Sequence, residues 1–259
     1  MNPILHSKIV GKGNPLLVLH GVFGLSDNWM SFAKVAAENF QVHLIDLRNH
    51  GRSFHSDEFN FDLMAADVYR YLMHHTLEKV SLLGHSLGGK VTIAFANKYP
   101  HLINKLVIVD IAPKAYPVHH QEIINALKSV NFREIKSRIE VEKILLDSIN
   151  DKEVIQFLAK NVYRKNETEL AFRFNINAIA ANVDQIVAES KLDDVIEIDT
   201  LFIKGANSNY ITKDDFDDIG KKFSSVTIET ISNAGHWVHA QNPSDFNNTV
   251  LNFLLLDNN

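Results

Sequence analysis

The residues of this 259-residue chain best suited to chemistry lie at 84–88, where the sequence reads Gly-His-Ser-Leu-Gly. An apolar run precedes this G-x-S-x-G pattern and a helical run follows it, so Ser86 is predicted to lie at a sharp strand-to-helix turn. Its neighbours must be small because strand and helix approach closely there. Such a turn exposes the hydroxyl and directs the N–H of Leu87 toward an oxyanion. We therefore predict a nucleophile rather than a helix-capping serine.

A serine hydroxyl needs a base, and the base needs an acid that orients it. His236 follows a glycine in the loop between the last predicted strand and the last helix, where a side chain can lean over the carboxyl edge of the sheet. His239 is the alternative base. It stands just before the helix that Pro243 begins, and we expect it to pack or cap there. His236 is therefore the predicted base.

Short apolar runs alternate with longer amphipathic runs along most of the chain. This alternation predicts an α/β fold, a doubly wound and mostly parallel sheet covered by helices on both faces. The predicted strands are 15–20, 41–47, 79–84, 105–111, 200–205 and 225–231, with an edge strand near 4–10. The helical patterns outside the insertion described next are 27–40, 61–76, 86–100, 213–223 and 243–256.

One segment interrupts the alternation. Residues 114–192 show only helical patterns, at 119–130, 141–149, 153–165 and 182–190. We expect an all-helical lid, inserted before the strand at 200–205 and covering one end of a core formed by 1–113 and 193–259. The apolar side chains of the lid predict an acyl-binding pocket. The predicted substrate-binding residues are Phe23, Ile123, Leu127, Phe157, Phe172 and Trp237.

Composition excludes several classes of protein. The chain has no cysteine, which rules out a disulfide framework, a thiolate nucleophile and a thiolate metal site. With a net charge of −5 and no stripe of Lys and Arg it lacks the footprint of a nucleic-acid-binding protein. Its apolar runs are too short to span a bilayer, and its first residues do not form a secretory signal. We expect a cytoplasmic protein.

Several segments together resemble the α/β-hydrolase superfamily, and within it the small bacterial esterases of the YbfF type. These segments are HGVFGLSDNW, LRNHGRS, GHSLGGK, VDIAP, GANSNYI and NAGHWVH, which span most of the chain. The resemblance implies a triad in the order Ser, acid, His, a small-molecule acyl ester or acyl-CoA thioester as substrate, and neither cofactor nor metal. It also implies that Val22 donates the second oxyanion N–H beside Leu87, and that Asp46 and Arg48 support the adjacent loop.

The acid departs from the usual superfamily pattern. The turn after the strand at 200–205 has Ser208 where Asp is expected, between two asparagines that carry no charge. The other acid position of the superfamily, at the end of the strand before the lid, has Asp110. We predict Asp110 as the acid, because ligands of such sheets bind beyond the strand ends; its alternative is a turn-forming Asp before Pro113. Asp214 and Asp215 are interpreted as helix N-terminal charges.

The leading hypothesis is a serine carboxylesterase that works through Ser86, Asp110 and His236 and an acyl-enzyme. A carbon–carbon bond hydrolase or a cofactor-free haloperoxidase or perhydrolase would use the same fold and the same serine. A non-catalytic ligand-binding homologue is the alternative from a different functional class. A serine-directed fluorophosphonate probe distinguishes this last alternative from the enzymes, because it labels only an activated nucleophile.

Overall fold

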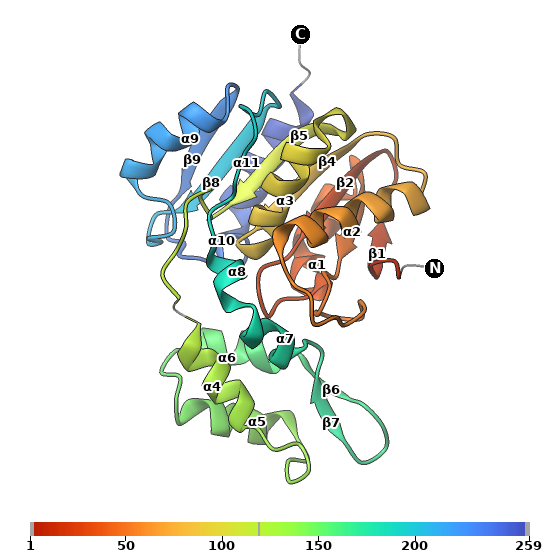
Figure 1. The fold of residues 1–259 in the computed structure, drawn as a ribbon, viewed down its shortest axis with the longest axis vertical. Coiled ribbons are helices and arrows are strands. Elements are labelled where there is room, and N and C mark those ends of the chain that lie inside the picture. The colour runs from red at the N-terminus through yellow and green to blue at the C-terminus, as the bar shows by residue number, and fades with distance from the viewer. Residues whose placement is uncertain (1–2, 119, 257–259) are drawn as a thin grey trace.

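The computed structural model describes residues 3–118 and 120–256, and within them seven strands form one sheet in the order β1-β3-β2-β4-β5-β8-β9 (Figure 1). Only β1 runs antiparallel to its neighbour; the other pairs are parallel. The mostly parallel sheet with an added edge strand is therefore confirmed. The bounds are β1 (Ser7–Val10), β2 (Asn14–Leu19), β3 (Phe40–Ile45), β4 (Val80–His85), β5 (Ile103–Val109), β8 (Thr200–Gly205) and β9 (Val226–Ile231).

Helices cover both faces of the sheet, which explains why its strands are apolar without alternation. In β2, Leu17 and Leu19 enter one apolar core, whereas Leu16 and Val18 enter the other. The first core is covered by α2 (Phe61–His74), α3 (Leu87–Lys98) and α9 (Phe216–Lys222). The second is covered by α1 (Met30–Ala36), α10 (Val238–Gln241) and α11 (Pro243–Leu255).

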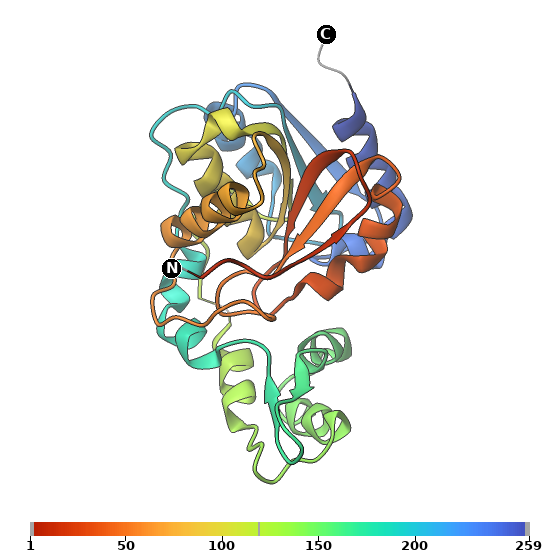
Figure 2. The same cartoon turned by 90° about the vertical axis from the view of Figure 1, so that its right-hand side faces the viewer.

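Most of the segment expected to form the lid, described over residues 114–118 and 120–192, lies beyond the end of the sheet where β5 terminates (Figures 1 and 2). We call this segment the lid. Its described helices are α4 (Gln121–Ser129), α5 (Arg138–Leu146), α6 (Lys152–Ala159), α7 (Ile176–Ala181) and α8 (Val183–Val187). The predicted helix at 119–130 begins at residue 119, outside the described residues. Lid side chains such as Leu145 and Leu158 belong to the same apolar cluster as Leu17 of the sheet.

The prediction that the lid is all-helical is wrong. The helix expected over 153–165 ends at Ala159, and a hairpin follows, with β6 (Val162–Arg164) pairing antiparallel with β7 (Leu170–Phe172). Val162 and Tyr163 fit the helical period, but β-branched and aromatic residues also favour strands. The hairpin turn is stabilised by Asn166, whose side chain accepts hydrogen bonds from two backbone N–H groups.

Candidate active site

Ser86 lies between β4 and α3 in a strained backbone conformation, with φ of 53° and ψ of −115°. The glycines around it are required by close approach. A Cβ at Gly84 would collide with the carbonyl oxygen of Gly88, and a Cβ at Gly88 would collide with that of Leu19 in β2. The expected strand-to-helix turn is therefore present, and it projects a serine from the N-terminus of a helix.

Two residues whose backbone N–H groups could bind an oxyanion lie beside Ser86. Val22 and Leu87 line the same small cavity as Ser86. Within residues 3–118 and 120–256, neither of these N–H groups donates a hydrogen bond to another protein group. The Ser86 hydroxyl also has no hydrogen-bond partner among the described residues; in free enzymes such bonds often form only when substrate binds.

Asp110 and His236 are joined by a hydrogen bond of 2.8 Å between Oδ2 and Nδ1. Asp110 directly follows β5 and is fully buried. Its carboxylate also accepts bonds from the Gly205 N–H at 3.0 Å and from the Ser208 hydroxyl at 2.5 Å. Because the carboxylate can only accept, the proton of the neutral imidazole lies on Nδ1, and Nε2 is left as an acceptor.

Tyr210 covers one face of this imidazole, a contact that sequence analysis did not predict. Its ring lies on that of His236 with centroids 3.9 Å apart and planes 16° apart. The Tyr116 hydroxyl donates a 2.7 Å hydrogen bond to the Tyr210 carbonyl, which fixes the loop that follows β8. Burial raises the pKa of Tyr210 to about 12, so the phenol stays neutral. The tyrosine lies within the segment GANSNYI, which sequence analysis quoted for the family resemblance without assigning Tyr210 a role.

Two more histidines adjoin His236. His85, which sequence analysis left without a role, donates from Nε2 to the His236 carbonyl at 2.9 Å. His239 stacks on Trp29 with ring centroids 3.9 Å apart, in agreement with the prediction that it packs. Burial lowers the pKa of His85 well below its ordinary value, and it lowers that of His239 to about 3. Both rings are therefore neutral near pH 7.

A pocket of about 380 Å³ opens beside Ser86 and His236. It brings together four of the six predicted substrate-binding residues, which are Phe23, Ile123, Phe157 and Trp237. The other two, Leu127 and Phe172, do not line this pocket, and their side chains pack against other apolar groups. Leu127 is 2% exposed within the apolar core, and Phe172 stacks on Phe174 and contacts Phe132.

A second, polar depression of about 710 Å³ adjoins this pocket and shares Glu153, Phe157 and Trp237 with it. Carboxamides predominate in its polar lining, with one Glu, one Lys and one His. The polar residues are Asn28, Gln156, Asn207, Asn233, Gln241, Glu153, Lys160 and His239. The site therefore has an apolar side, formed partly by the lid, and an adjoining polar side.

Comparison with known proteins defines the family. Residues 14–243 match the model of the family described as alpha/beta hydrolase fold. The chain belongs to that family. It is 33% identical to esterase YbfF of Escherichia coli over 90% of this chain and 89% of that protein. It is 35% identical to an sn-1-specific diacylglycerol lipase, ABHD11, of Danio rerio over 94% and 80% of the two chains.

A solved structure titled marine microorganism esterase superposes with a TM-score of 0.95. The two chains are 38% identical, and the match covers 97% of this chain and 100% of that one. The family match, the named relatives and this structure agree. This α/β hydrolase is an enzyme that acts on ester bonds.

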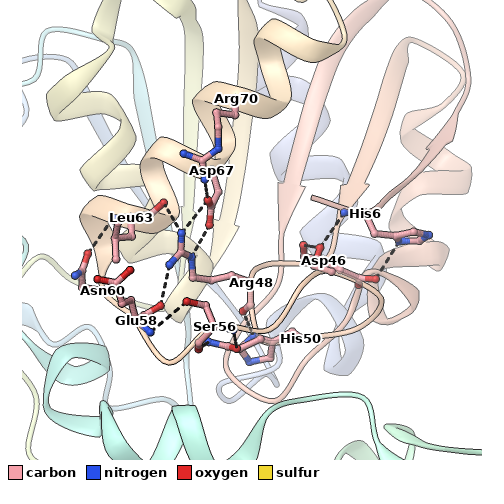
Figure 3. A network of polar contacts seen from close by, with 12 residues as sticks. His6, Asp46, Arg48, His50, Ser56, Glu58, Asn60, Leu63, Asp67 and Arg70 are labelled. Carbon is pink, nitrogen blue, oxygen red and sulfur yellow. Dashed lines mark hydrogen bonds and ion pairs between the residues drawn. The ribbon is translucent and has the colours of Figure 1, made fainter. Parts of the chain in front are cut away.

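Beside the site, the family segment at 46–53 forms a buried polar network (Figure 3). Asp46 accepts backbone hydrogen bonds from Ser26 at 2.7 Å and Arg52 at 2.9 Å. Arg48 binds Asp67 of α2 through two nitrogens, at 2.5 and 2.9 Å. These bonds connect the segment after β3 with Ser26, in the segment after β2, and with α2. Asp46 and Arg48 therefore support the loop beside the site, as the resemblance implied.

Lys90 of this hydrolase fastens both ends of the lid to the core. Its ammonium, buried at 1% exposure, donates to the carbonyls of Pro113 at 2.9 Å, Lys114 at 2.5 Å and Ala188 at 3.0 Å. Burial lowers its pKa to about 7. Sequence analysis quoted this lysine within GHSLGGK without assigning it a role.

The described residues contain neither a group of His, Asp and Glu arranged to hold a metal nor a helix long and apolar enough to cross a membrane.

Proposed function

We propose that this hydrolase is a serine carboxylesterase that works through an acyl-enzyme. His236 Nε2 takes the Ser86 proton as Oγ attacks the carbonyl carbon of the substrate. The oxyanion accepts hydrogen bonds from the N–H groups of Val22 and Leu87. His236 then protonates the leaving alcohol. Water, deprotonated by the same ring, cleaves the acyl-enzyme and regenerates Ser86.

The observation that carries the proposal is the 2.8 Å bond between buried Asp110 and His236, whose side chain lines the same pocket as Ser86. A carboxylate on Nδ1 fixes the tautomer in which Nε2 can accept a proton, and it stabilises the imidazolium that results. The strained turn at Ser86 and the two backbone N–H groups beside it supply the other parts of the same chemistry. None of these steps calls for a metal or a cofactor.

The two sides of the site suggest how an ester would bind. We assign the acyl chain to the apolar pocket beside Phe157 and Trp237, and the alcohol to the polar depression. A thioester would react by the same steps, with a thiol as leaving group. Acyl-CoA thioesters therefore belong in the same substrate series as oxygen esters.

The test is hydrolysis of p-nitrophenyl esters of graded acyl length, and of acyl-CoA thioesters, by wild type and Ser86→Ala. Wild type should turn over esters and react with a fluorophosphonate probe, whereas Ser86→Ala should do neither. Ser244→Ala, an exposed serine of α11, serves as the control. Ester turnover by Ser86→Ala would overturn the proposal. Probe labelling without ester turnover would indicate a carbon–carbon bond hydrolase or haloperoxidase, and a wild type that does not label would indicate a ligand-binding protein.

A further inference from the structure

A buried amide connects the lid to the turn that carries Val22. Asn161 lies just after α6, and its side chain is 0% exposed. Its Nδ2 donates a 2.7 Å hydrogen bond to the carbonyl oxygen of Phe23, 138 residues away in the chain. A longer bond, 3.5 Å, runs from the same nitrogen to the Phe157 carbonyl. Since both partners are carbonyls, only the nitrogen of the amide can face them.

The turn that Asn161 contacts needs external support. Phe23 has φ of 59°, in the left-handed region that is unfavourable for a bulky side chain. Its N–H donates to His50 Nε2 at 3.1 Å, and its carbonyl accepts from Asn161. The two peptide groups that flank Phe23 are thus held by different parts of the chain, one by the core and one by the lid. The Val22 N–H lies in the same turn, one peptide group from the Phe23 N–H and two from the carbonyl that Asn161 binds.

We propose that Asn161 is a positioning residue through which the lid aims the Val22 N–H at the oxyanion. The inference rests on the proposed function, because it assumes that Val22 is an oxyanion donor. Such a donor is effective only if it is oriented before charge develops. A misplacement of about 1 Å can cost about 10² in rate. The docked lid therefore contributes to transition-state stabilisation as well as to substrate binding.

The chain supplies a matched control in Asn182, a second lid asparagine. Its Nδ2 donates to the backbone carbonyl of Asp57 in the core at 3.0 Å. The two residues make the same type of bond between lid and core, but Asp57 does not line the pocket of the active site. A general loosening of the lid would affect both variants, whereas loss of oxyanion positioning would affect only Asn161.

The experiment compares Asn161→Asp and Asn161→Ser with Asn182→Asp and Asn182→Ser. Neither an ionised Asp nor a shorter Ser can make the bond to Phe23. We expect the Asn161 variants to lose about 10- to 100-fold in kcat with KM within about twofold, and the Asn182 variants to keep kcat within about twofold. Circular dichroism checks the fold, and Asn161→Ser decides the outcome if burying a carboxylate unfolds the other variant.

An alkylboronic acid provides the second readout. Its boron bonds to Ser86 Oγ while the serine proton passes to His236, so that a boronate oxygen occupies the oxyanion site. The affinity for this acid should fall in the Asn161 variants by about the same factor as kcat. Wild-type kcat in both Asn161 variants, an equal loss in the Asn182 variants, or unchanged boronate affinity would overturn the inference. If instead Ser86→Ala retains turnover, the proposed function itself fails.

Discussion

Ser208 donates a hydrogen bond to Oδ2 of Asp110, the same oxygen that His236 Nδ1 contacts. The residue at the usual acid position of the superfamily thus supports a carboxylate on the neighbouring strand. β5 and β8 are adjacent and parallel, with Val109 opposite Ile203, so the two positions lie beside each other at the same edge of the sheet. A carboxylate on either strand can therefore reach the same imidazole.

The first prediction concerns this acid. Asp110→Asn should lower kcat on the order of 10⁴-fold, because an amide can hold the wrong imidazole tautomer and cannot stabilise the imidazolium. Ser208→Ala should cost far less, since it removes only one of the hydrogen bonds to Asp110. The measurement is kcat on a p-nitrophenyl ester, with folding checked by circular dichroism.

Asp214→Asn is the control for this prediction, because Asp214 is an exposed acid in the segment just after β8. It should retain wild-type kcat. The double variant Asp110→Asn with Ser208→Asp should regain part of the lost activity, because a carboxylate then returns to the other strand. Greater damage in Asp214→Asn or Asp215→Asn than in Asp110→Asn would place the acid after the lid instead.

The second prediction concerns the ring that covers His236. Tyr210→Leu should lower kcat about fivefold, because the stacked aromatic face holds the imidazole and favours the imidazolium by about 1 kcal/mol. Tyr210→Phe keeps that face and should remain within about twofold of wild type. The two variants separate stacking from any effect of the hydroxyl, and equal kcat values for Leu and Phe would reject a role for the ring.

The third prediction is acid lability. Burial lowers the pKa of His43 to about 4 and those of His50 and His239 to about 3. Between these values and the unfolded value of about 6.5, the unfolded chain binds protons that the folded chain does not. The contribution of these histidines to the free energy of unfolding is therefore fully present above about pH 6.5 and is lost as the pH falls. Burial also lowers the pKa of His85 well below its ordinary value, so at least four histidines contribute. The free energy of unfolding should therefore fall by at least about 5 kcal/mol per pH unit near pH 5.

Urea unfolding between pH 4.5 and 7.5 measures this slope. His43→Gln should reduce this slope by about 1.4 kcal/mol per pH unit, the value for one proton. His74→Gln, a change at an exposed position of α2, should leave the slope unaltered. The prediction is contradicted if stability is flat from pH 7 to pH 5.

The fold could be predicted, and three residues of the candidate site could be singled out, because local sequence features mark them. The glycines around Ser86 are required by the close approach of β2, β4 and α3. The four residues 106–109 before Asp110 are all apolar because both faces of the strand are buried there. His236 follows a glycine between a strand and a helix. In each case the signal lies within a few residues of the position that it marks.

The supporting residues could not be predicted, because their partners are distant in the sequence. Tyr210 contacts His236, Lys90 binds the carbonyl of Ala188, and Asn161 binds that of Phe23. Nothing local distinguishes these side chains from exposed polar residues. The lid hairpin was missed for another reason, since the helical period of α6 extends by chance into β6.

The last prediction concerns the acyl chain length that the enzyme prefers. Phe157 lines the pocket and lies 5.5 Å from Trp237, ring centroid to centroid, so Phe157→Ala should lengthen the apolar space. Each further buried methylene stabilises the bound acyl chain by about 0.8 kcal/mol, or about fourfold in kcat/KM. The optimum on p-nitrophenyl esters should therefore shift to longer chains in Phe157→Ala and to shorter chains in Phe157→Trp.

Leu127→Ala is the matched control for Phe157→Ala, because Leu127 is an apolar lid residue that sequence analysis assigned to the pocket and that packs in the core instead. Its truncation should cost about 2–5 kcal/mol of stability while leaving the chain-length optimum unchanged. An optimum that moves in Leu127→Ala but not in Phe157→Ala would mean that the acyl chain binds on the opposite side of α4. Unchanged optima in all three variants would remove the lid from acyl selection.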